Sequence, residues 1–290
     1  SRMSSMRLLV HEPMNTRWIG SRDVIRFAVV GAAMRILLSE QSFGALGLFT
    51  VVGMGSDQLV SFYALLTVAS LVGLVLSVLL LNPLDLLRPV MFATALIAIG
   101  AFMDASATNL TRPASLYFSQ ALIAFAAIYF VGPTMMVGLL RALAKGPNHI
   151  ISFSAVFGIS QTLGGIGGAA SLGSFQVIRE KFHSNALTQS LVETDPLVVT
   201  RLQQLGGAYA RSIGDPVQRH TQALNLLSQQ VAREANILAF NDVFFLIGVL
   251  ALLVFIWLAT RWSILKYRGI NPLAAELAAL QKMMTQRQAT

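Results

Sequence analysis

The sequence predicts an all-α membrane protein built as a six-transmembrane-helix bundle, and two observations lead to this fold class. Of the 290 residues, 55% are hydrophobic and only 12% are charged, whereas soluble domains carry roughly 25% charged residues. A helix that spans a bilayer needs about 20 mostly apolar residues. Six segments have about this length and character: 23–52, 59–81, 89–105, 114–140, 150–177 and 241–262.

The rest of the composition argues against other classes of protein. A net charge of +8 fits a membrane protein whose Lys and Arg gather in cytoplasmic loops. No basic run is interleaved with aromatic residues, so no nucleic-acid partner is expected. The chain has no cysteine and only four dispersed histidines, which predicts neither disulfides nor a metal site. Without a nucleophile–base pair, no enzyme activity and no cofactor are expected.

Individual spans differ in character. The first, residues 23–52, is long and unusually polar, and the third, residues 89–105, is short. Pro133 stands inside the fourth span, directly after Gly132. Because proline cannot continue the helical hydrogen-bond ladder, we expect a kink there.

The basic residues predict that both ends of the bundle are cytoplasmic. In short loops, Lys and Arg mark the cytoplasmic side of a membrane, and the short loops of the opposite side carry only Arg112. Arg179 and Lys181 argue mildly the other way, but they open a loop of roughly 60 residues, at which length the rule stops counting charges reliably. We therefore expect an integral protein of the plasma membrane, which in bacteria is the inner membrane. The cytoplasmic set is Arg17, Arg22, Arg88, Arg141, Lys145, Arg261, Lys266 and Arg268.

Three segments are predicted to lie outside the membrane. Residues 1–22 form a cytoplasmic linker, 178–240 a long periplasmic or extracellular loop, and 263–290 an amphipathic cytoplasmic tail. The loop is expected to be helical, because Asp195-Pro196 and Asp215-Pro216 each place an N-cap residue before a proline at the first helical position. The second of these helices is expected to run into the sixth span. The loop either caps the bundle or docks a partner protein.

Ionisable side chains within a bilayer are costly and therefore indicate function. Arg26 lies about one turn from the cytoplasmic boundary, where it can reach lipid phosphates. Arg35 and Glu40 lie near the middle of the first span and face directions roughly 140° apart. At least one of them lines a water-filled path, in which Glu40 could carry a proton, or both belong to a structural charge network. Asp57 and Asp104, at the outer boundary, are expected to be solvated.

The fifth span contains the glycine-rich stretch "SQTLGGIGGAASLGSF", residues 160–175. Its G-x-G-x-x-A spacing matches a dinucleotide fingerprint, but that site needs a strand before the glycines and an acid about 20 residues later. Read as a helix, the stretch places Gly164 and Gly168 in the small-xxx-small pattern of close helix contact. Gln161, Gly165 and Leu172 share that face. Both smooth packing and sliding against a neighbouring helix fit this surface.

Three further polar residues are candidates for lining a substrate pathway. They are Gln120 and Tyr129 in the fourth span and Gln161 in the fifth. Such groups suit reversible contact with a drug-like compound, but they equally suit interhelical hydrogen bonds.

Several of these stretches resemble the C-terminal half of a major facilitator superfamily transporter, in particular the 14-helix drug:proton antiporter (EmrB-type) branch. "SFSAVFGISQTLGGIGGAASLGSF" is close to that branch's F-x(n)-R-x-L-G-G-x-x-G pattern, with Gln161 where many relatives have arginine. "ANILAFNDVFFLIGVLALL" is similar to the stretch before the branch's last helix, and "NPLDLLRP" stands where the family has an Asp/Arg loop motif. The likeness covers about residues 15–265.

This resemblance implies proton-coupled efflux of drugs or other organic compounds by alternating access between two six-helix halves. It implies that the chain is a piece of a longer transporter, whose N-terminal half is a partner. A small-molecule substrate, the lipid bilayer and a periplasmic adaptor protein bound through residues 178–240 are the other implied partners. Asp85 and Arg88 would form a loop gate.

Two alternatives stay open. One is a metabolite exporter of the same fold. The other is a non-transporting six-helix membrane scaffold subunit, for which a start codon just upstream of Ser1 is expected instead of further helices in the same frame.

Overall fold

The computed structural model of the chain describes residues 22–82, 85–145, 149–192 and 194–270, together with Ala274, Glu276, Ala278 and Thr285. These residues are mostly helical, and no β-strand occurs among them. Residues 1–21 of the predicted linker, and most of the predicted tail beyond Ile270, lie outside the described part of the chain.

Twelve helical elements follow one another along the described ranges, three of them short π or 3-10 segments named η. In chain order they are α2 (Arg22–Leu37), η2 (Glu40–Ala45), α3 (Leu46–Val51), η3 (Ser56–Leu59), α4 (Val60–Leu79), α5 (Leu87–Asp104), η4 (Pro113–Leu116), α6 (Tyr117–Tyr129), α7 (Val131–Lys145), α8 (His149–Ser190), α9 (Pro196–Gly207) and α10 (Pro216–Tyr267).

The chain is a membrane-embedded helical protein. Five helical stretches in the described residues are long and apolar enough to cross a bilayer, namely Ser56–Leu79, Leu87–Asp104, Pro113–Ala144, His149–Ser190 and Pro216–Tyr267. On α4 the side chains of Leu71, Val75 and Leu79 are more than half exposed. A continuous aliphatic surface of this kind is stable against lipid and unstable against water.

The first predicted span, residues 23–52, is helical but divided. It consists of α2, the π-helical η2 and α3, and each piece is shorter than 18 residues. The Ser39 hydroxyl donates to the carbonyl of Arg35 at 3.2 Å, a bond that competes with the regular helix ladder. Beyond it, Gly44 and Gly47 admit the rings of Phe244 and Phe240, which occupy the space that a Cβ would need.

The fourth predicted span is kinked, as the sequence predicts. Helix α6 ends at Tyr129 and α7 begins at Val131. A proline ring clashes with the carbonyl four residues earlier, which is that of Tyr129, and has no N–H to donate to it. Pro133 therefore interrupts the helix at Phe130.

The longer helices pack in a series in which each contacts the next. The neighbouring pairs are α2–α8, α8–α10, α10–α5, α5–α6 and α6–α4. The shared core is aliphatic and aromatic, with Met34, Ile97, Ile123 and Ile247 fully buried at its centre.

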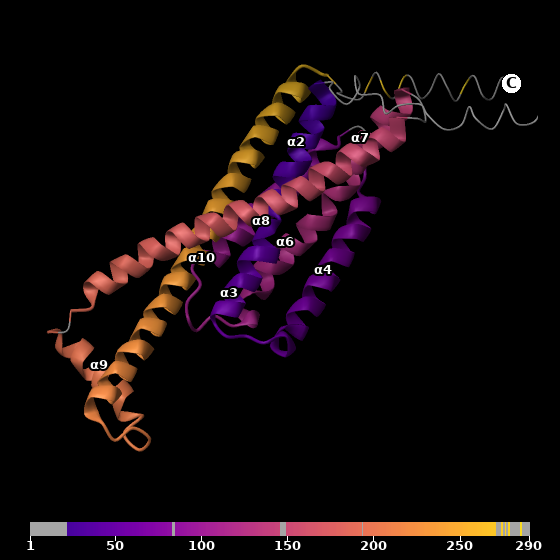
Figure 1. The fold of residues 1–290 in the computed structure, drawn as a ribbon. Coiled ribbons are helices and arrows are strands. Elements are labelled where there is room, and N and C mark those ends of the chain that lie inside the picture. The colour runs from indigo at the N-terminus through magenta and orange to yellow at the C-terminus, as the bar shows by residue number, and fades with distance from the viewer. Residues whose placement is uncertain are drawn as a thin grey trace, which may run out of the picture.

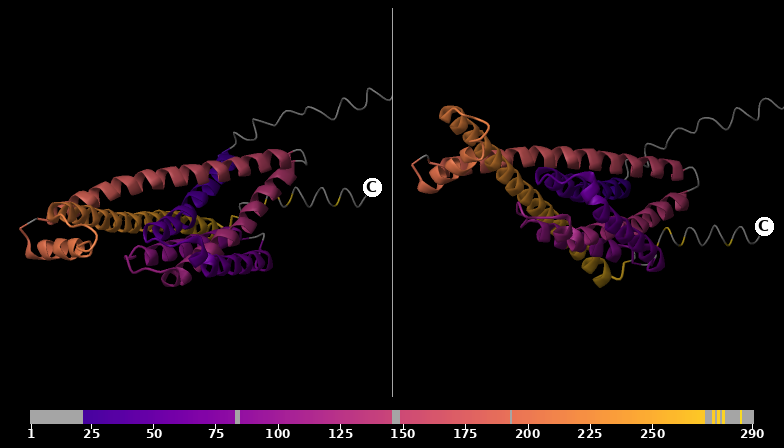
Figure 2. Two further views of the ribbon diagram at one scale, coloured as in Figure 1. Left: turned by 60° about the horizontal axis from the view of Figure 1, so that its bottom comes forward. Right: turned by 90° about the horizontal axis from the view of Figure 1, so that it is seen from below.

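Two long helices extend beyond one end of the bundle and carry α9 there (Figures 1 and 2). Residues 178–190 of the predicted loop continue α8, and α10 runs unbroken from the loop into the last span. Both predicted N-caps form: Asp195 accepts from the Leu197 N–H at 2.8 Å, and Asp215 accepts from the Val217 N–H at 3.0 Å. The prediction of a helical loop with two capped helices is confirmed.

An ionic cluster joins α8 to α10 where the two helices leave the bundle. One carboxylate oxygen of Asp242 lies 2.6 Å from the Arg179 Nε and 2.6 Å from the His183 Nε2. Gln176 donates to the Asn236 side chain at 2.8 Å just beside it. These contacts hold the projecting part of α8 against α10.

Candidate functional site

A buried pair of carboxyl groups lies near the end of the bundle from which α8 and α10 project. Glu40 is the first residue of η2, and its side chain is completely buried. Asp104 is the last residue of α5 and is 1% exposed. The two side chains lie close together, because both accept from the same amide nitrogen of Gln120. We refer to Glu40 and Asp104 as the carboxyl pair.

Gln120, on α6, connects the two members of the pair. Its Nε2 donates to the two Glu40 oxygens at 2.8 and 3.1 Å and to Asp104 Oδ2 at 2.7 Å. The amide oxygen of Gln120 accepts from Gln41 Nε2 at 3.3 Å, which fixes the orientation of the amide. Ser119, the neighbouring residue on α6, donates its hydroxyl to Asp104 Oδ1. Three elements, η2, α5 and α6, therefore meet at one polar cluster.

The prediction that Asp104 is solvated is wrong, because its carboxyl group is buried against α6, where it accepts from Ser119 and Gln120. Asn241 on α10 accepts from the Ala107 N–H at 3.1 Å and donates to the Ala107 carbonyl at 2.8 Å. This pair of bonds holds the chain just beyond α5 against α10. Asp57, in contrast, is exposed as predicted.

The carboxyl pair has hydrogen-bond donors around it, and no cation in the described part of the chain forms an ion pair with it. Within the described residues, the ion pairs of the chain involve other acids: Asp85, Asp242 and Glu276. Nor does that part of the chain contain a group of three His, Cys, Asp or Glu residues that could hold a metal ion. Among the described residues, the side-chain donors to these two acids are Gln120 and Ser119.

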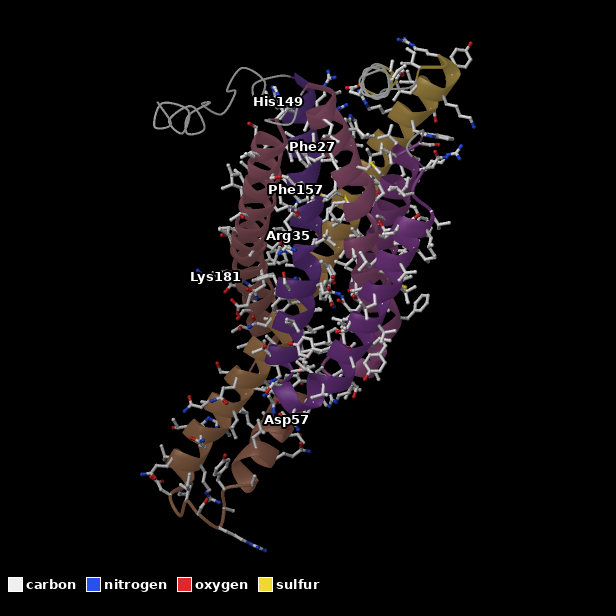
Figure 3. All side chains as sticks on the ribbon, turned by 90° about the vertical axis from the view of Figure 1, so that its right-hand side faces the viewer. Phe27, Arg35, Asp57, His149, Phe157 and Lys181 are labelled. Atoms are coloured by element: carbon white, nitrogen blue, oxygen red, sulfur yellow. The ribbon has the colours of Figure 1, made fainter. Side chains whose placement is uncertain are left out.

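Arg35 faces away from the carboxyl pair, as the helical geometry of the first span predicts. Its side chain is exposed and lies beside α8, where it contacts the position that a Cβ on Gly165 would take. Figure 3 shows it about midway between His149, at one end of the bundle, and Asp57, at the other. One helical segment thus carries an uncovered cation on one side and a buried acid on the other.

The glycines of α8 lie where that helix approaches α2 most closely. A Cβ on Gly164 would meet the Ala32 carbonyl oxygen at 2.7 Å, and one on Gly168 would meet Ser39 Oγ at 2.5 Å. A Cβ on Gly167, between them in sequence, would meet nothing within 4 Å. The close approach of α2 therefore leaves no room for a side chain at Gly164 or Gly168, whereas Gly167 has open space.

The other two pathway candidates are apart from the carboxyl pair. Gln161 donates from Nε2 to the Gly31 carbonyl at 3.2 Å, across the α2–α8 contact. Tyr129 is buried in the aromatic core, stacked on Phe125 with ring centroids 5.2 Å apart. Of the three polar candidates, only Gln120 lies with Glu40.

The predicted loop-gate residues form a connection to the end of α10. Asp85 pairs with Arg88 at 2.6 Å and accepts from the Trp262 indole N–H at 3.2 Å. The Arg88 guanidinium and the Lys266 ammonium lie over the Trp262 ring, at 4.9 and 4.8 Å from its centroid. The chain between α4 and α5 is thereby tied to α10 at the end of the bundle opposite α9 (Figure 1).

Sequence reasoning missed three members of the polar cluster: Asp104, Ser119 and Gln41. Asp104 stands at the end of an apolar span, a position at which most acids reach water. Its involvement depends on tertiary packing against Ser119 and Gln120 of α6. The sequence feature that indicates a polar cluster is the pair Ser119-Gln120 inside an apolar helix. It identifies Gln120 but not the acid that Gln120 binds.

Comparison of the chain with protein-family models, curated proteins and solved structures finds no match. The resemblance to the major facilitator superfamily therefore stays a prediction.

Proposed function

We propose that the chain is one half of a proton-coupled secondary transporter that exports a drug-like or other organic compound by alternating access. The observation that carries this proposal is the carboxyl pair. Its two acids are contributed by different helices, lie within the apolar bundle and share one amide donor, and no cation among the described residues pairs with them.

In this proposal the pair holds one exchangeable proton. Two carboxylates in contact repel each other strongly in surroundings of low dielectric constant, and an uncompensated charge is costly there. A single proton shared between Glu40 and Asp104 removes the repulsion and provides the hydrogen for the contact between them. Ionisable residues within a bilayer are typical of proton relays in transporters.

Arg35 supports an aqueous path along the face shared by α2 and α8. A guanidinium near the bilayer centre costs about 3 kcal/mol or more when it faces lipid, and Arg35 is exposed on that face. Water, together with the N-terminal half of the transporter, would cover it. The substrate pathway would then run past Arg35, with Gln161 and the glycines of α8 beside it.

The two sites are close enough to be coupled mechanically. Glu40 follows Arg35 by five positions on one helical segment. The π-helical turn η2 begins at Glu40. π-Helical turns often occur at functional positions. A shift of α2 along the glycine face of α8 would move both residues, so substrate passage and proton exchange could drive each other.

The proposal includes the remaining expectations about topology and partners. Both ends would be cytoplasmic in a bacterial inner membrane, with the loop gate of Asp85 and Arg88 on that side. The hairpin of α9 and α10 would lie outside and contact a periplasmic adaptor protein. The alternative is a transporter of the same fold with another coupling or direction, such as a metabolite exporter.

The test is drug extrusion from vesicles that contain the complete transporter, driven by an imposed pH gradient. We expect Glu40→Gln to abolish gradient-driven extrusion. Exchange of substrate between two sides at equal concentration should remain. Asp57→Asn, which removes an exposed carboxyl group, is the matched control and should extrude normally. Unchanged extrusion by Glu40→Gln would remove this residue from the mechanism.

A further inference from the structure

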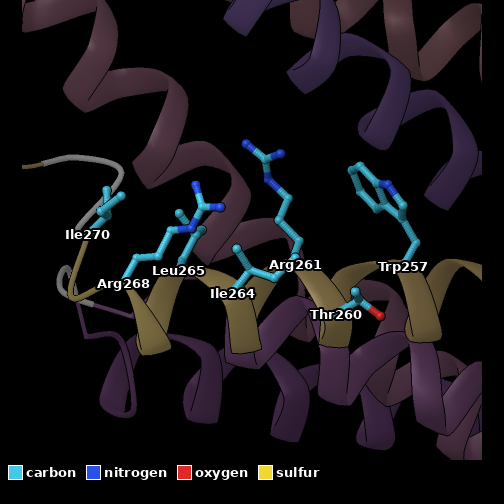
Figure 4. Close-up of a pocket in the computed structure, with 7 residues that line it drawn as sticks. All are labelled: Trp257, Thr260, Arg261, Ile264, Leu265, Arg268 and Ile270. Atoms are coloured by element: carbon cyan, nitrogen blue, oxygen red, sulfur yellow. The ribbon is translucent and has the colours of Figure 1, made fainter.

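An open cavity lies along the C-terminal end of α10, at the opposite end of the helix from α9. Its volume is about 420 Å³. Figure 4 shows the side chains that line it, which combine arginines with apolar groups. They are Trp257, Thr260, Arg261, Ile264, Leu265, Arg268 and Ile270.

The two arginines lie on the same side of α10. At about 100° per residue, positions four and eleven residues after Trp257 fall within roughly 40° of its direction. Figure 4 shows Arg261 and Arg268 extending from the helix toward the same side, with Trp257 further along. Trp262, which binds Asp85, lies on a different face.

This side of α10 carries positive charge that no described acid neutralises. Neither Arg261 nor Arg268 forms an ion pair within the described ranges, and both are exposed. The acids at this end have other partners: Asp85 pairs with Arg88 at 2.6 Å, and Glu276 lies 3.8 Å from Arg141. The cavity is therefore complementary to an anion.

The same face continues into the span as apolar surface. Trp257 is 49% exposed and Leu253 is 57% exposed. Eight residues separate Leu253 from Arg261, a rise of about 12 Å, and half of a bilayer's hydrocarbon core is about 15 Å thick. Tryptophan is enriched at the membrane–water interface, so Trp257 marks the level at which the acyl region gives way to the headgroups.

We propose that this cavity binds an anionic phospholipid. The lipid phosphate contacts Arg261 and Arg268, and its acyl chains lie along Trp257 and Leu253. Arginine suits this role because its planar guanidinium donates two parallel hydrogen bonds to phosphate. The two arginines are separated by about 10 Å along the helix axis, so a lipid with two phosphates, such as cardiolipin, satisfies both better than a lipid with one.

The test measures binding of cardiolipin, phosphatidylglycerol and phosphatidylcholine to the purified chain in detergent by native mass spectrometry. We expect the affinity for cardiolipin to fall roughly thirtyfold in the double variant Arg261→Gln/Arg268→Gln, because each basic residue at an anionic membrane surface contributes about fivefold. The charge-conserving variant Arg261→Lys/Arg268→Lys should lose less affinity than the glutamine variant but more than the control, because an ammonium group keeps the charge without the two parallel hydrogen bonds. Phosphatidylcholine should bind weakly to all of them.

A matched control removes two arginines from the other end of the molecule. Arg211 and Arg233 are exposed, and Arg211→Gln/Arg233→Gln should bind cardiolipin as the unmodified chain does. Equal loss in this control would mean that net charge, and not the cavity, determines binding, and the proposal would fail. It would also fail if inorganic phosphate at the same concentration displaced the lipid fully, since the site would then recognise a free anion.

Discussion

Replacing Gln120 with leucine removes the amide that joins the carboxyl pair, and the stability cost can be worked from its contacts. Gln120 Nε2 makes three contacts of 2.7–3.1 Å with carboxyl oxygens. Interhelical hydrogen bonds in membrane proteins average about 0.6 kcal/mol, with a maximum of about 1.7 kcal/mol, and bonds to charged groups lie at the upper end. Because two buried acids lose a donor together, we expect a loss of roughly 2–4 kcal/mol in the free energy of unfolding.

The assay is denaturant unfolding of the purified chain in mild detergent, followed by circular dichroism. Gln161→Leu is the matched control, since Gln161 makes one interhelical bond, to the Gly31 carbonyl at 3.2 Å, and is only partly buried. It should cost about 0.6 kcal/mol. Equal losses for the two variants, or no loss for Gln120→Leu, would show that the amide does not support the pair.

Three further predictions concern helix contacts and ends. Gly168→Leu should destabilise the chain by about 1–3 kcal/mol because its side chain would overlap α2, whereas Gly167→Leu, with open space, should cost less than about 0.5 kcal/mol; thermal unfolding compares them. Trp262→Phe removes the hydrogen bond to Asp85. The thiol introduced by Leu81→Cys should then be labelled severalfold faster, and an unchanged labelling rate would contradict a gate. Asp215→Ala should cost about 1 kcal/mol, seen as faster hydrogen exchange in the first turn of α10, with exchange in α9 unchanged.

Features that depend on local physics could be predicted from the sequence. Pro133 breaks its helix because of its own ring, and Asp195 and Asp215 cap helices through bonds two residues away. The directions of Arg35 and Glu40 follow from the rotation per residue of a helix. These properties need no knowledge of neighbouring helices.

Features that depend on residues far apart in the sequence could not be predicted from it. Asp104 is buried against Ser119 and Gln120 of α6 and shares its amide donor with Glu40, which lies sixty-four positions earlier in the sequence. The π-helical turn that begins at Glu40 contains Gly44, against which a ring of α10 packs. The sequence therefore predicts one acid of the candidate site and misses the other.

The most direct test of the central claim is infrared spectroscopy of the reconstituted chain, which detects the stretching band of a protonated carboxyl group. We predict such a band in the unmodified chain and in Asp57→Asn, and its loss in the double variant Glu40→Gln/Asp104→Asn. Identical spectra for the unmodified chain and the double variant in this region would contradict a proton shared by the carboxyl pair.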